Sequence, residues 1–424
     1  MRRARRALLV LENEGLPRDR RVWDEARALS GAGWAVEAIA PRVRAGEPAE
    51  EVLEGIRVHR FRARFASGAL GYAREYAAAW VGIRRLARRL ARRGAEPFDV
   101  VGVANPPDFL GWAVSPLLAR GARLVFDQHD LTPELYRSRF GAGPLHRALL
   151  ALERRALRAA DVVVVANDSY RRLALARAGL DRERVHVVRN GPDLARFRPV
   201  APDPALRRGR RHLLAYLGVM GPQDGIDHAL HALAELRRRR GADWRAIFIG
   251  EGDVLEEMRG LAAGLGLQGD VEFAGWRGDD DIRRILSSAD VCLAPDPPSP
   301  LNVLSSMVKV PEYMAMGRPI ASYELPETQA AAGPAAAYAR EPVPAELARC
   351  IDELLDDPAR RERMGREALR RVERLAWERQ ARELVRAYER AALAPPRGRR
   401  LERELRSGRV AIGQPADRPG EELG

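Results

Sequence analysis

Short apolar runs alternate with longer amphipathic runs along most of this chain, and this alternation limits its possible folds more than any other feature. The runs ALLVL (7–11), DVVGVA (99–104) and DVVVVAN (161–167) have the length of buried strands. Between such runs, apolar residues recur at the spacing of one helix face, as in RDRRVWDEARALSGAG (18–33), which ends in glycine. Strands that alternate with helices predict an α/β architecture with parallel sheets.

The alternation stops once and then restarts. Residues 189–211, RNGPDLARFRPVAPDPALRRGRR, are rich in proline, glycine and charge and have no clear period, which is typical of a linker. A second series of strands and helices begins at HLLAYLGV (212–219). We therefore predict two Rossmann-like domains, over 1–195 and 205–371.

The two ends of the sequence carry patterns of their own. The first apolar run is too short for the core of a signal peptide and ends in Glu12, so it is predicted to be a strand. No apolar stretch approaches the roughly 20 residues that a membrane span needs. One long helical run is predicted over about 358–392. The tail, 393–424, lacks a core pattern and is predicted to be disordered.

The composition of the chain limits the classes of partner that it can be expected to bind. The formal charge of +13 predicts attraction to polyanions: nucleic acid, anionic membranes or phosphorylated substrates. Aromatic residues make up only 6% and do not interleave with the arginines, so we expect no nucleic-acid partner. The two cysteines, Cys292 and Cys350, lie in dissimilar contexts, which excludes a disulfide framework and fits a reducing cytosol.

One predicted helix, 72–94, is strongly amphipathic. Its apolar stripe comprises Tyr72, Tyr76, Trp80, Ile83, Leu86 or Ala87, and Leu90, and its basic face comprises Arg84, Arg85, Arg88, Arg89, Arg92 and Arg93. Such a helix can lie on an anionic membrane. It can also pack its stripe on the core and leave the arginines in solvent, and both interpretations stay open.

Polar residues that directly follow strands are the first candidates for a site, because ligands of open α/β sheets bind beyond the carboxyl ends of the strands. The segment DQHDLTPELY follows the strand RLVF. Its Asp127 and His129 could bind a sugar hydroxyl or carry a proton. A helix start explains the same segment, with Asp130 or Thr132 as its cap. Both explanations can hold together.

Loops after other strands supply weaker candidates. Gly15 and Arg18 lie in a turn that opens the first helix, and helix N-termini suit phosphates and hydroxyls. Gly218, Gly221 and Gly250 follow strands of the second series and would let the backbone approach a ligand closely. An ordinary loop explains each of these glycines as well.

Lys309 is the only lysine; the other 71 of the 72 cationic side chains are arginines. It precedes a helix predicted to begin near Val310 or Pro311, where a cation is unfavourable beside the positive end of the helix dipole. An anion bound between the ammonium and the free amides would make it favourable. Glu312, in the first turn, suits the dipole and could accept both hydroxyls of a ribose. A coding bias toward arginine that left one lysine by chance explains Lys309 equally well.

In this order and spacing, the motifs resemble bacterial family-4-type glycosyltransferases of the GT-B fold, in which two Rossmann-like domains face a central cleft. The resemblance runs over roughly 5–392. It is carried by segments that include VFDQHDLTPELY, VVRNGPDLARFRP, YLGVMGPQDGIDHALHAL, FIGEGD, VEFAGW and SPLNVLSSMVKVPEYMAMGRPIASYELPET. Together they are specific to the superfamily, and to no single sugar.

The resemblance implies an enzyme that binds a nucleoside diphosphate sugar on its C-terminal domain and a glycan or polyprenyl-linked acceptor on its N-terminal domain. Transfer would retain the anomeric configuration and use no metal or other cofactor. A cytoplasmic enzyme of cell-envelope or exopolysaccharide synthesis is implied, which could touch the inner face of the plasma membrane. The helix in 372–392 would return to the N-terminal domain.

The resemblance also assigns residues. Glu312 matches the glutamate that holds the nucleotide ribose. The matching segments add Trp276, Asn302, Ser305 and Ser306 to the donor-binding candidates, beside Lys309. His129, Lys309 and Glu312 are the candidates for catalysis.

Two cations of the family pattern are absent from their positions. The arginine and lysine that clamp the donor diphosphate fall at Val219 and Asp224. Stabilisation of the departing charge usually contributes more to such catalysis than any other effect. Lys309 is the nearest candidate to replace them.

The family's first motif glutamate, which contacts the donor sugar, falls at Leu304, and Asn302 or Asp296 could substitute. Two alternatives to a transferase stay open. A nucleotide-sugar epimerase shares the architecture, since fold does not fix function. A degenerate transferase could serve as a binding or scaffold subunit, which the lost clamp favours.

Overall fold

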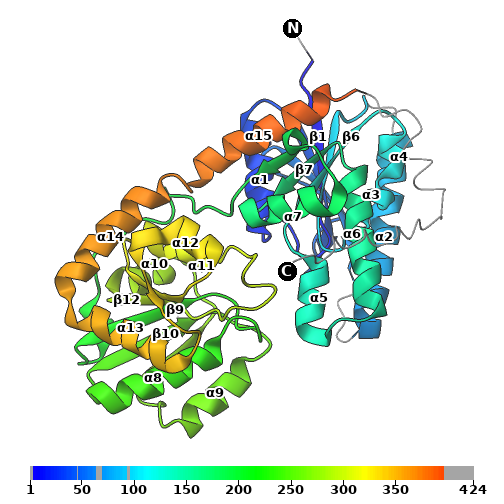
Figure 1. Cartoon of the computed structure of the whole chain (residues 1–424). Coiled ribbons are helices and arrows are strands. Elements are labelled where there is room, and N and C mark those ends of the chain that lie inside the picture. Colours follow the sequence, from blue (N-terminus) through cyan, green and yellow to red (C-terminus); the bar gives the residue numbers. More distant parts are fainter. Residues whose placement is uncertain (1–2, 45, 64–68, 93–95, 396–424) are drawn as a thin grey trace, which may run out of the picture.

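The computed structural model describes residues 3–44, 46–63, 69–92 and 96–395, and it shows two α/β domains side by side (Figure 1). Within the described residues each domain is built on one sheet, of eight strands in the N-terminal domain and six in the C-terminal domain. Among the described strands every neighbouring pair is parallel except one. The predicted fold class, with two parallel-sheet domains, is confirmed.

The N-terminal sheet has the strand order β3-β4-β2-β1-β5-β6-β7-β8. Its strands are β1 (Arg6–Val10), β2 (Ala35–Arg42), β3 (Glu50–Leu53), β4 (Ile56–Arg62), β5 (Val100–Ala104), β6 (Arg123–Gln128), β7 (Val162–Val165) and β8 (Val185–Val187). The antiparallel pair, β3 and β4, was not expected. It is a tight hairpin whose two turn residues, Glu54 and Gly55, both have positive φ.

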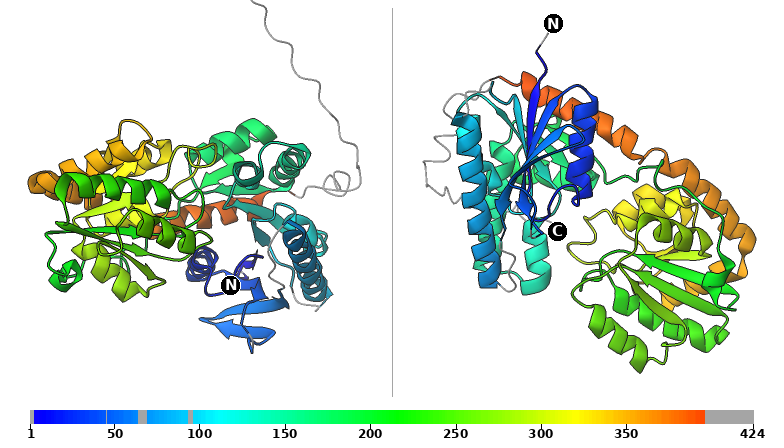
Figure 2. Two further views of the ribbon diagram at one scale, coloured as in Figure 1. Left: turned by 90° about the horizontal axis from the view of Figure 1, so that it is seen from below. Right: turned by 180° about the vertical axis from the view of Figure 1, so that it is seen from behind.

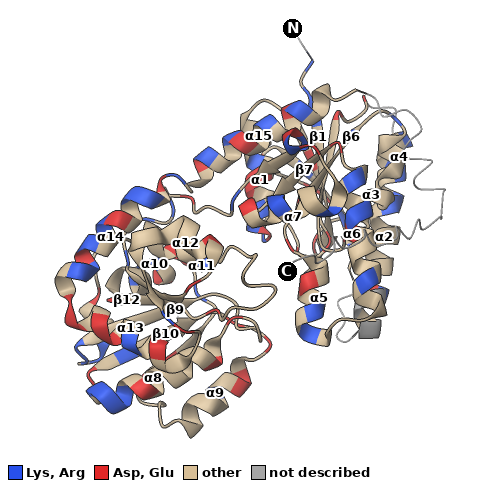
Figure 3. Cartoon of the chain, viewed as in Figure 1, with Lys and Arg blue, Asp and Glu red and all other residues tan. Residues whose placement is uncertain are grey.

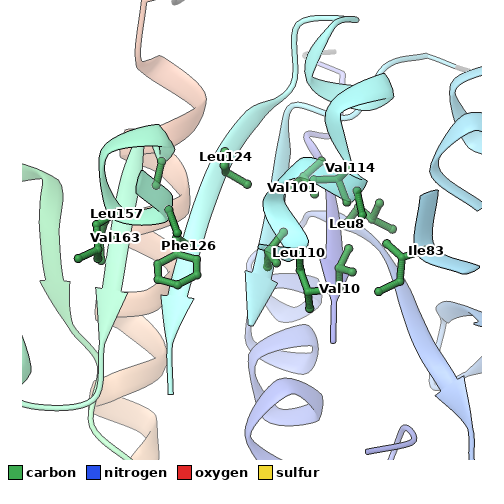
Figure 4. Packing of buried hydrophobic residues seen from close by; sticks show 14 of the residues in the cluster. Leu8, Val10, Ile83, Val101, Leu110, Val114, Leu124, Phe126, Leu157 and Val163 are labelled. Atoms are coloured by element: carbon green, nitrogen blue, oxygen red, sulfur yellow. The ribbon is translucent and has the colours of Figure 1, made fainter. Parts of the chain in front are cut away.

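Both faces of this sheet are buried. In β1, Leu8 and Val10 join one apolar cluster, and Ala7 and Leu9 join another on the opposite face. Figure 4 shows part of the first cluster, where side chains of several strands meet Ile83 of a covering helix. Continuous apolar strands therefore reflect helices on both sides.

The helices of the N-terminal domain are α1 (Arg20–Gly31), α2 (Ala69–Arg92), α3 (Leu110–Ala113), α4 (Ser115–Leu118), α5 (Thr132–Phe140), α6 (Pro144–Ala159) and α7 (Asp168–Ala178), with a 3₁₀ turn η1 (Arg182–Arg184). Two corrections apply. The alternation of strands and helices predicts one helix between β5 and β6, but two short ones, α3 and α4, form there, since Pro116 cannot donate the backbone bond that would join them. Neither Asp130 nor Thr132 caps α5, whose N-cap is Leu131.

The C-terminal sheet has the order β11-β10-β9-β12-β13-β14. Its strands are β9 (His212–Leu217), β10 (Trp244–Ile249), β11 (Val271–Gly275), β12 (Val291–Ala294), β13 (Ile320–Tyr323) and β14 (Ala336–Ala339). Its helices are η2 (Pro204–Arg207), α8 (Ile226–Arg240), α9 (Leu255–Gly264), α10 (Asp279–Ser288), α11 (Lys309–Ala315), α12 (Pro326–Ala332), η3 (Gly333–Ala335) and α13 (Pro344–Asp356).

The helical run expected over 358–392 is also divided. It forms α14 (Pro358–Val372) on the C-terminal domain and α15 (Trp377–Leu393), which crosses to the N-terminal domain (Figure 2). At the break, Trp377 N donates to Pro192 O, so this crossing runs beside the linker. The apolar residues of α15, Leu384, Ala387, Tyr388 and Ala391, pack in a core cluster of the N-terminal sheet. Of the predicted disordered tail, residues 396–424 lie outside the described part of the chain.

The apolar stripe of α2 packs on the core. Ile83 and Ala87 are fully buried, and Trp80, Leu86 and Leu90 pack against the same cluster. The stripe is therefore not available to insert into a membrane. Basic residues, coloured blue in Figure 3, occupy several other positions of the helix, and one of them, Arg84, turns inward to Trp112 O and Ser115 Oγ. Arg93 lies outside the described residues. None of the described helices combines the length and the apolar character that crossing a membrane requires.

Candidate functional site

Lys309 occupies a buried position at the carboxyl edge of the C-terminal sheet. Its Nζ lies 2.6 Å from Asp296 Oδ1 and 3.7 Å from Asp224 Oδ1, and it stands 5.0 Å from the centre of the Tyr216 ring. Lys309 is 6% exposed and Asp296 is 1% exposed. Burial opposes the charge of Lys309, but the nearby carboxylates, Asp296 above all, raise its pKa above the ordinary value.

This geometry corrects one expectation. The helix α11 begins at Lys309 itself and is only seven residues long. The ammonium donates to Asp296 instead of facing an anion across free helix amides. The lone lysine is therefore held by side chains of two other loops, one after β9 and one after β12.

Glu312 lies one turn further along α11 and is half-buried. Burial raises the pKa of its carboxyl group to about 7, against the opposing charge of Arg196, while Asp279 raises it further. Arg196 forms a two-bond ion pair with Asp279. Arg20, from the N-terminal domain, joins the same carboxylate at 3.0 Å.

Trp276 lies beside these charges and is 66% exposed. A surface hollow is lined by Trp276, Arg196 and residues 278–281 of the C-terminal domain together with Arg20 of the N-terminal domain. An exposed indole beside paired arginines offers a flat surface for a heterocycle. Trp276 and Glu312, both predicted as donor-binding residues, thus share Arg196 and Asp279 as neighbours.

The glycines after the strands are explained by close backbone packing. A Cβ on Gly250 would stand 1.9 Å from Gly218 O, so these two loops touch directly. Both have positive φ, +153° for Gly218 and +132° for Gly250. A Cβ on Gly218 would also meet Lys309 Cε at 3.1 Å. Gly221 N donates to Asp224 Oδ2 and closes the turn that holds this carboxylate.

The segment 299–306 joins the two domains. Asn302 is 2% exposed and donates to Gln223 O and Pro297 O, so its amide is used within the loops. Ser305 Oγ lies 3.2 Å from Tyr170 Oη of the N-terminal domain. Ser306 Oγ is buried and finds no hydrogen-bond partner among the described residues.

Leu304, at the position of the missing glutamate, belongs to the same junction. Its carbonyl oxygen accepts a hydrogen bond from Asn167 Nδ2 at 2.9 Å. Leu301 and Leu304 pack with the apolar cluster of the N-terminal sheet. Leu304 thus contributes to the contact between the domains.

The N-terminal domain brings Asp127 and His129 together at the end of β6. His129 Nε2 lies 2.8 Å from Asp127 Oδ2. Burial alone would raise the pKa of Asp127, but the charges of Arg21 and His129 hold it below its ordinary range. Because Asp127 is ionised, Nε2 donates to it, and in the neutral form of the His129 ring Nδ1 is then available to accept a hydrogen bond from a hydroxyl.

Two residues of α1, absent from the predicted site, complete this cluster. Arg21 Nη2 lies 3.0 Å from Asp127 Oδ1, and its Nε lies 3.2 Å from Glu25 Oε1. Burial, and then the charge of Asp127, raise the pKa of Glu25 well above its ordinary value. Arg21 and Glu25 stand at i and i+4 on one helix face, a spacing that could have identified them as a pair.

The carboxylates of Glu25 and Asp127 and a nitrogen of His129 lie within 4.8 Å of one another, close enough to hold a metal ion. Arg21 already supplies a positive charge to both carboxylates. The two acidic side chains of this cluster are therefore already paired with a cation, the guanidinium of Arg21.

Asn105 orients the loop that carries His129. Its Oδ1 accepts hydrogen bonds from the backbone N–H groups of His129 and Asp130, and its Nδ2 donates to Asp108 Oδ1. Asn105 directly follows the apolar strand β5. A polar residue directly after a strand is the same signal that identified Asp127. By contrast, Arg18 points to the surface beside Glu14.

Gly15 serves the turn before α1. Its carbonyl oxygen accepts from Arg18 N and Asp19 N, and a Cβ on Gly15 would meet Val43 Cγ2 at 2.8 Å. Asp19 then caps α1 by accepting from Val22 N. This turn directs Arg20 and Arg21, rather than Arg18, toward the two clusters described above.

Known proteins share both halves of this chain. The family model "Glycosyltransferase Family 4" matches residues 19–196, and "Glycosyl transferases group 1" matches residues 211–357. The MMP alpha-(1->4)-mannosyltransferase of Mycolicibacterium hassiacum is 29% identical over 72% of this chain and 74% of its own length. The 2-deoxystreptamine glucosyltransferase of Streptomyces kanamyceticus is 30% identical over 50% of this chain, and the match spans only 56% of that protein.

Solved structures agree on the fold over nearly the whole chain. Sucrose-phosphate synthase from Thermosynechococcus elongatus superposes with a TM-score of 0.73 and 20% identity, covering 91% of this chain and 98% of its own. Anabaena HepE in complex with UDP superposes with a TM-score of 0.62 and 18% identity, covering 91% and 99%. With matches to both halves and a shared two-domain architecture, this chain belongs to the family-4-type glycosyltransferases of the GT-B fold.

Proposed function

We propose that this glycosyltransferase moves a sugar from a nucleoside diphosphate sugar to a glycan or lipid-linked acceptor, with retention of configuration. One observation carries the proposal. Asp224 stands at the sequence position of the missing clamp lysine, and Lys309 Nζ lies 3.7 Å from its carboxylate. The cation lost from one loop is supplied at almost the same point in space by another.

Each domain contributes one part of the proposed reaction. In the C-terminal domain, Trp276 offers a stacking surface for the base, Glu312 accepts the ribose hydroxyls and Lys309 meets the diphosphate. In the N-terminal domain, His129 Nδ1 accepts a hydrogen bond from a sugar hydroxyl. Neutralising the departing diphosphate supplies the main catalytic effect, and no metal is assigned a role.

A donor screen tests this proposal. Purified protein is incubated with UDP-, GDP- and ADP-sugars and a panel of glycan and polyprenyl-linked acceptors. UDP-sugars come first, because one structural neighbour was solved with UDP. Transfer from one nucleotide class is expected, and NMR of the product should show the anomeric configuration of the donor. Lys309→Met is expected to abolish transfer, whereas Arg18→Met, at the surface, should leave it unchanged. Inversion at the anomeric carbon would contradict retention.

A scaffold subunit is the second candidate. Two carboxylates, Asp224 and Asp296, flank the single cation at the proposed diphosphate site. If both are ionised, the local charge is negative, which disfavours a polyanion. Protein that binds no nucleotide in calorimetry, yet folds and melts cooperatively, would favour the scaffold subunit and defeat the transferase.

We further propose that the enzyme meets its acceptor at the cytoplasmic face of the cell envelope. Arg85, Arg88, Arg89 and Arg92 lie exposed on α2 and line one surface hollow. Each arginine near an anionic bilayer contributes about 1 kcal/mol of binding. We expect the protein to sediment with vesicles that contain anionic lipid and not with neutral ones.

A charge-matched comparison decides whether helix α2 is responsible for the binding to anionic vesicles. Replacing Arg85, Arg88 and Arg92 by serine should abolish sedimentation. Replacing three exposed cations on the other domain, Arg363, Arg366 and Arg374, changes the net charge equally and should not. Equal loss in both variants would mean that only total charge matters.

A further inference from the structure

In the part of the chain that the structure describes, the cluster around Lys309 contains one cation and two carboxylates, and one carboxylate oxygen finds no hydrogen-bond partner. Asp296 Oδ1 accepts from Lys309 Nζ at 2.6 Å, while Asp296 Oδ2 is buried without a hydrogen-bond partner among the described residues. Asp224 Oδ1 faces the same ammonium at 3.7 Å. The ammonium has three donors, and only its bond to Asp296 is short, so its longer contacts with Asp224 and Tyr216 can be exchanged for a further acceptor.

Stability alone does not account for this arrangement. A buried ion pair is commonly no more stabilising than apolar residues of the same volume. An unpartnered buried oxygen is unfavourable in addition. Residues that weaken the fold in this way are found most often at functional sites, where a charge must be kept available.

The cluster lies directly behind Gly218, at the carboxyl end of β9. A Cβ at this position would stand 3.1 Å from Lys309 Cε and 3.0 Å from Tyr216 Oη. The next residue, Val219, is 64% exposed. Gly218, which has no side chain, therefore lies between the buried Lys309 and the exposed Val219.

We propose that Asp296 and Asp224 are positioning residues that hold Lys309 ready for the donor diphosphate and compete with it for the ammonium. Lys309 then changes partner in each turnover, from carboxylate to diphosphate and back, and the carboxylates help to release the nucleotide. The inference rests on the proposed transferase function. It explains why two acidic side chains lie at a site that, in that proposal, binds an anion.

Replacing each carboxylate by its neutral isostere separates this role from a structural one. Asp296→Asn removes the competing charge and should tighten UDP binding by about tenfold, the worth of one charge-assisted hydrogen bond. It should also lower kcat, because the nucleotide leaves more slowly. Lys309→Met should weaken UDP binding. If Asp296 merely supports the fold, Asp296→Asn will weaken binding as Lys309→Met does, and the proposal fails.

Two further variants serve as controls. Asp224→Asn should act in the same direction as Asp296→Asn but less strongly, and its half-buried position keeps the test open if Asp296→Asn does not fold. Asp290 precedes β12 as Asp296 follows it, and it pairs with Arg207 at 2.6 Å. Asp290→Asn is the same substitution at the opposite end of the strand, and nucleotide affinity should not change.

The single lysine makes the exchange directly visible. Labelling with ¹³C,¹⁵N-lysine gives one set of side-chain signals, since the chain contains one lysine. Titration with UDP, or with GDP or ADP if calorimetry selects them, should shift these signals with the same Kd that calorimetry reports. Binding without a shift overturns the partner exchange and leaves the transferase proposal standing. Absence of binding by any nucleotide overturns the transferase proposal itself.

Discussion

Leu301→Ala should loosen the junction between the two domains while each domain stays folded. Leu301 belongs to the C-terminal domain but is 8% exposed within the apolar cluster of the N-terminal sheet. The neighbouring bonds, from Asn167 to Leu304 O and between Tyr170 and Ser305, do not involve its side chain. The substitution therefore removes apolar contact across the junction and keeps its hydrogen bonds.

The magnitude follows from the carbons removed. Leucine to alanine deletes three carbons, worth about 2.4 kcal/mol at ~0.8 kcal/mol for each buried group. This lowers the equilibrium constant between the joined and the separated arrangement about 50-fold, since ~1.4 kcal/mol is a factor of ten in an equilibrium constant. If transfer takes place only when the domains are joined, kcat/KM should fall by up to the same factor.

Small-angle scattering and donor kinetics together test the prediction. Leu301→Ala should increase the radius of gyration, and a saturating donor should reverse part of that increase. Leu157, fully buried in the same cluster but contributed by α6, is the matched control. Leu157→Ala should lower the melting temperature and leave the radius unchanged. The reasoning is refuted if Leu301→Ala lowers the melting temperature equally with no change in radius or kcat/KM.

Three further predictions concern single side chains. Burial raises the pKa of Glu312 to about 7, so affinity for a UDP-sugar should rise between pH 6 and 8, and Glu312→Gln should flatten that profile. Because this pKa is higher in the folded protein, its contribution to stability is lost as pH rises through about 7, and above it Glu312→Gln should melt later than the unsubstituted protein. Trp276→Ala should cost about 1–3 kcal/mol of nucleotide binding in calorimetry, the range for stacked bases, with an unchanged melting temperature. Arg21→Met leaves Asp127 buried without its cation and should cost about 3–5 kcal/mol in urea unfolding, which Asp127→Asn should partly restore.

The fold could be predicted from sequence where strands are buried on both faces. Runs such as those of β1 and β7 are apolar throughout because helices cover both sides of the sheet. The edge strands carry no such signal. Alanine favours helices, so the Ala-rich sequence of β14 does not predict a strand. Its place in the sheet is fixed by pairing with β13. Charged residues interrupt the apolar residues of β3 and β4, so neither has the continuous apolar run of a buried strand, although Glu54–Gly55 marks a hairpin turn.

The candidate site could be predicted only in part, because sequence reveals which residues follow a strand but not which way a helix turns. His129 and Asp127 follow β6 and do form a pair. The sequence does not show which of three neighbouring arginines is buried: Arg18, Arg20 or Arg21. The geometry of the turn at Gly15 decides that Arg21 is buried against Asp127 while Arg18 is exposed.

The same limit applies to the proposed diphosphate cation, and it bears on why one lysine persists among 71 arginines. Motif positions are defined along the chain, whereas a charge acts through space, so a cation lost at residue 224 can return from residue 309. The returning side chain must fit beneath Gly218 and beside the Tyr216 ring. A guanidinium presents five donors in a rigid plane and would leave several of them unpaired there, whereas an ammonium is compact and rotates between acceptors. A buried cation that must exchange a carboxylate for a phosphate therefore favours lysine over arginine, whatever the composition of the rest of the chain.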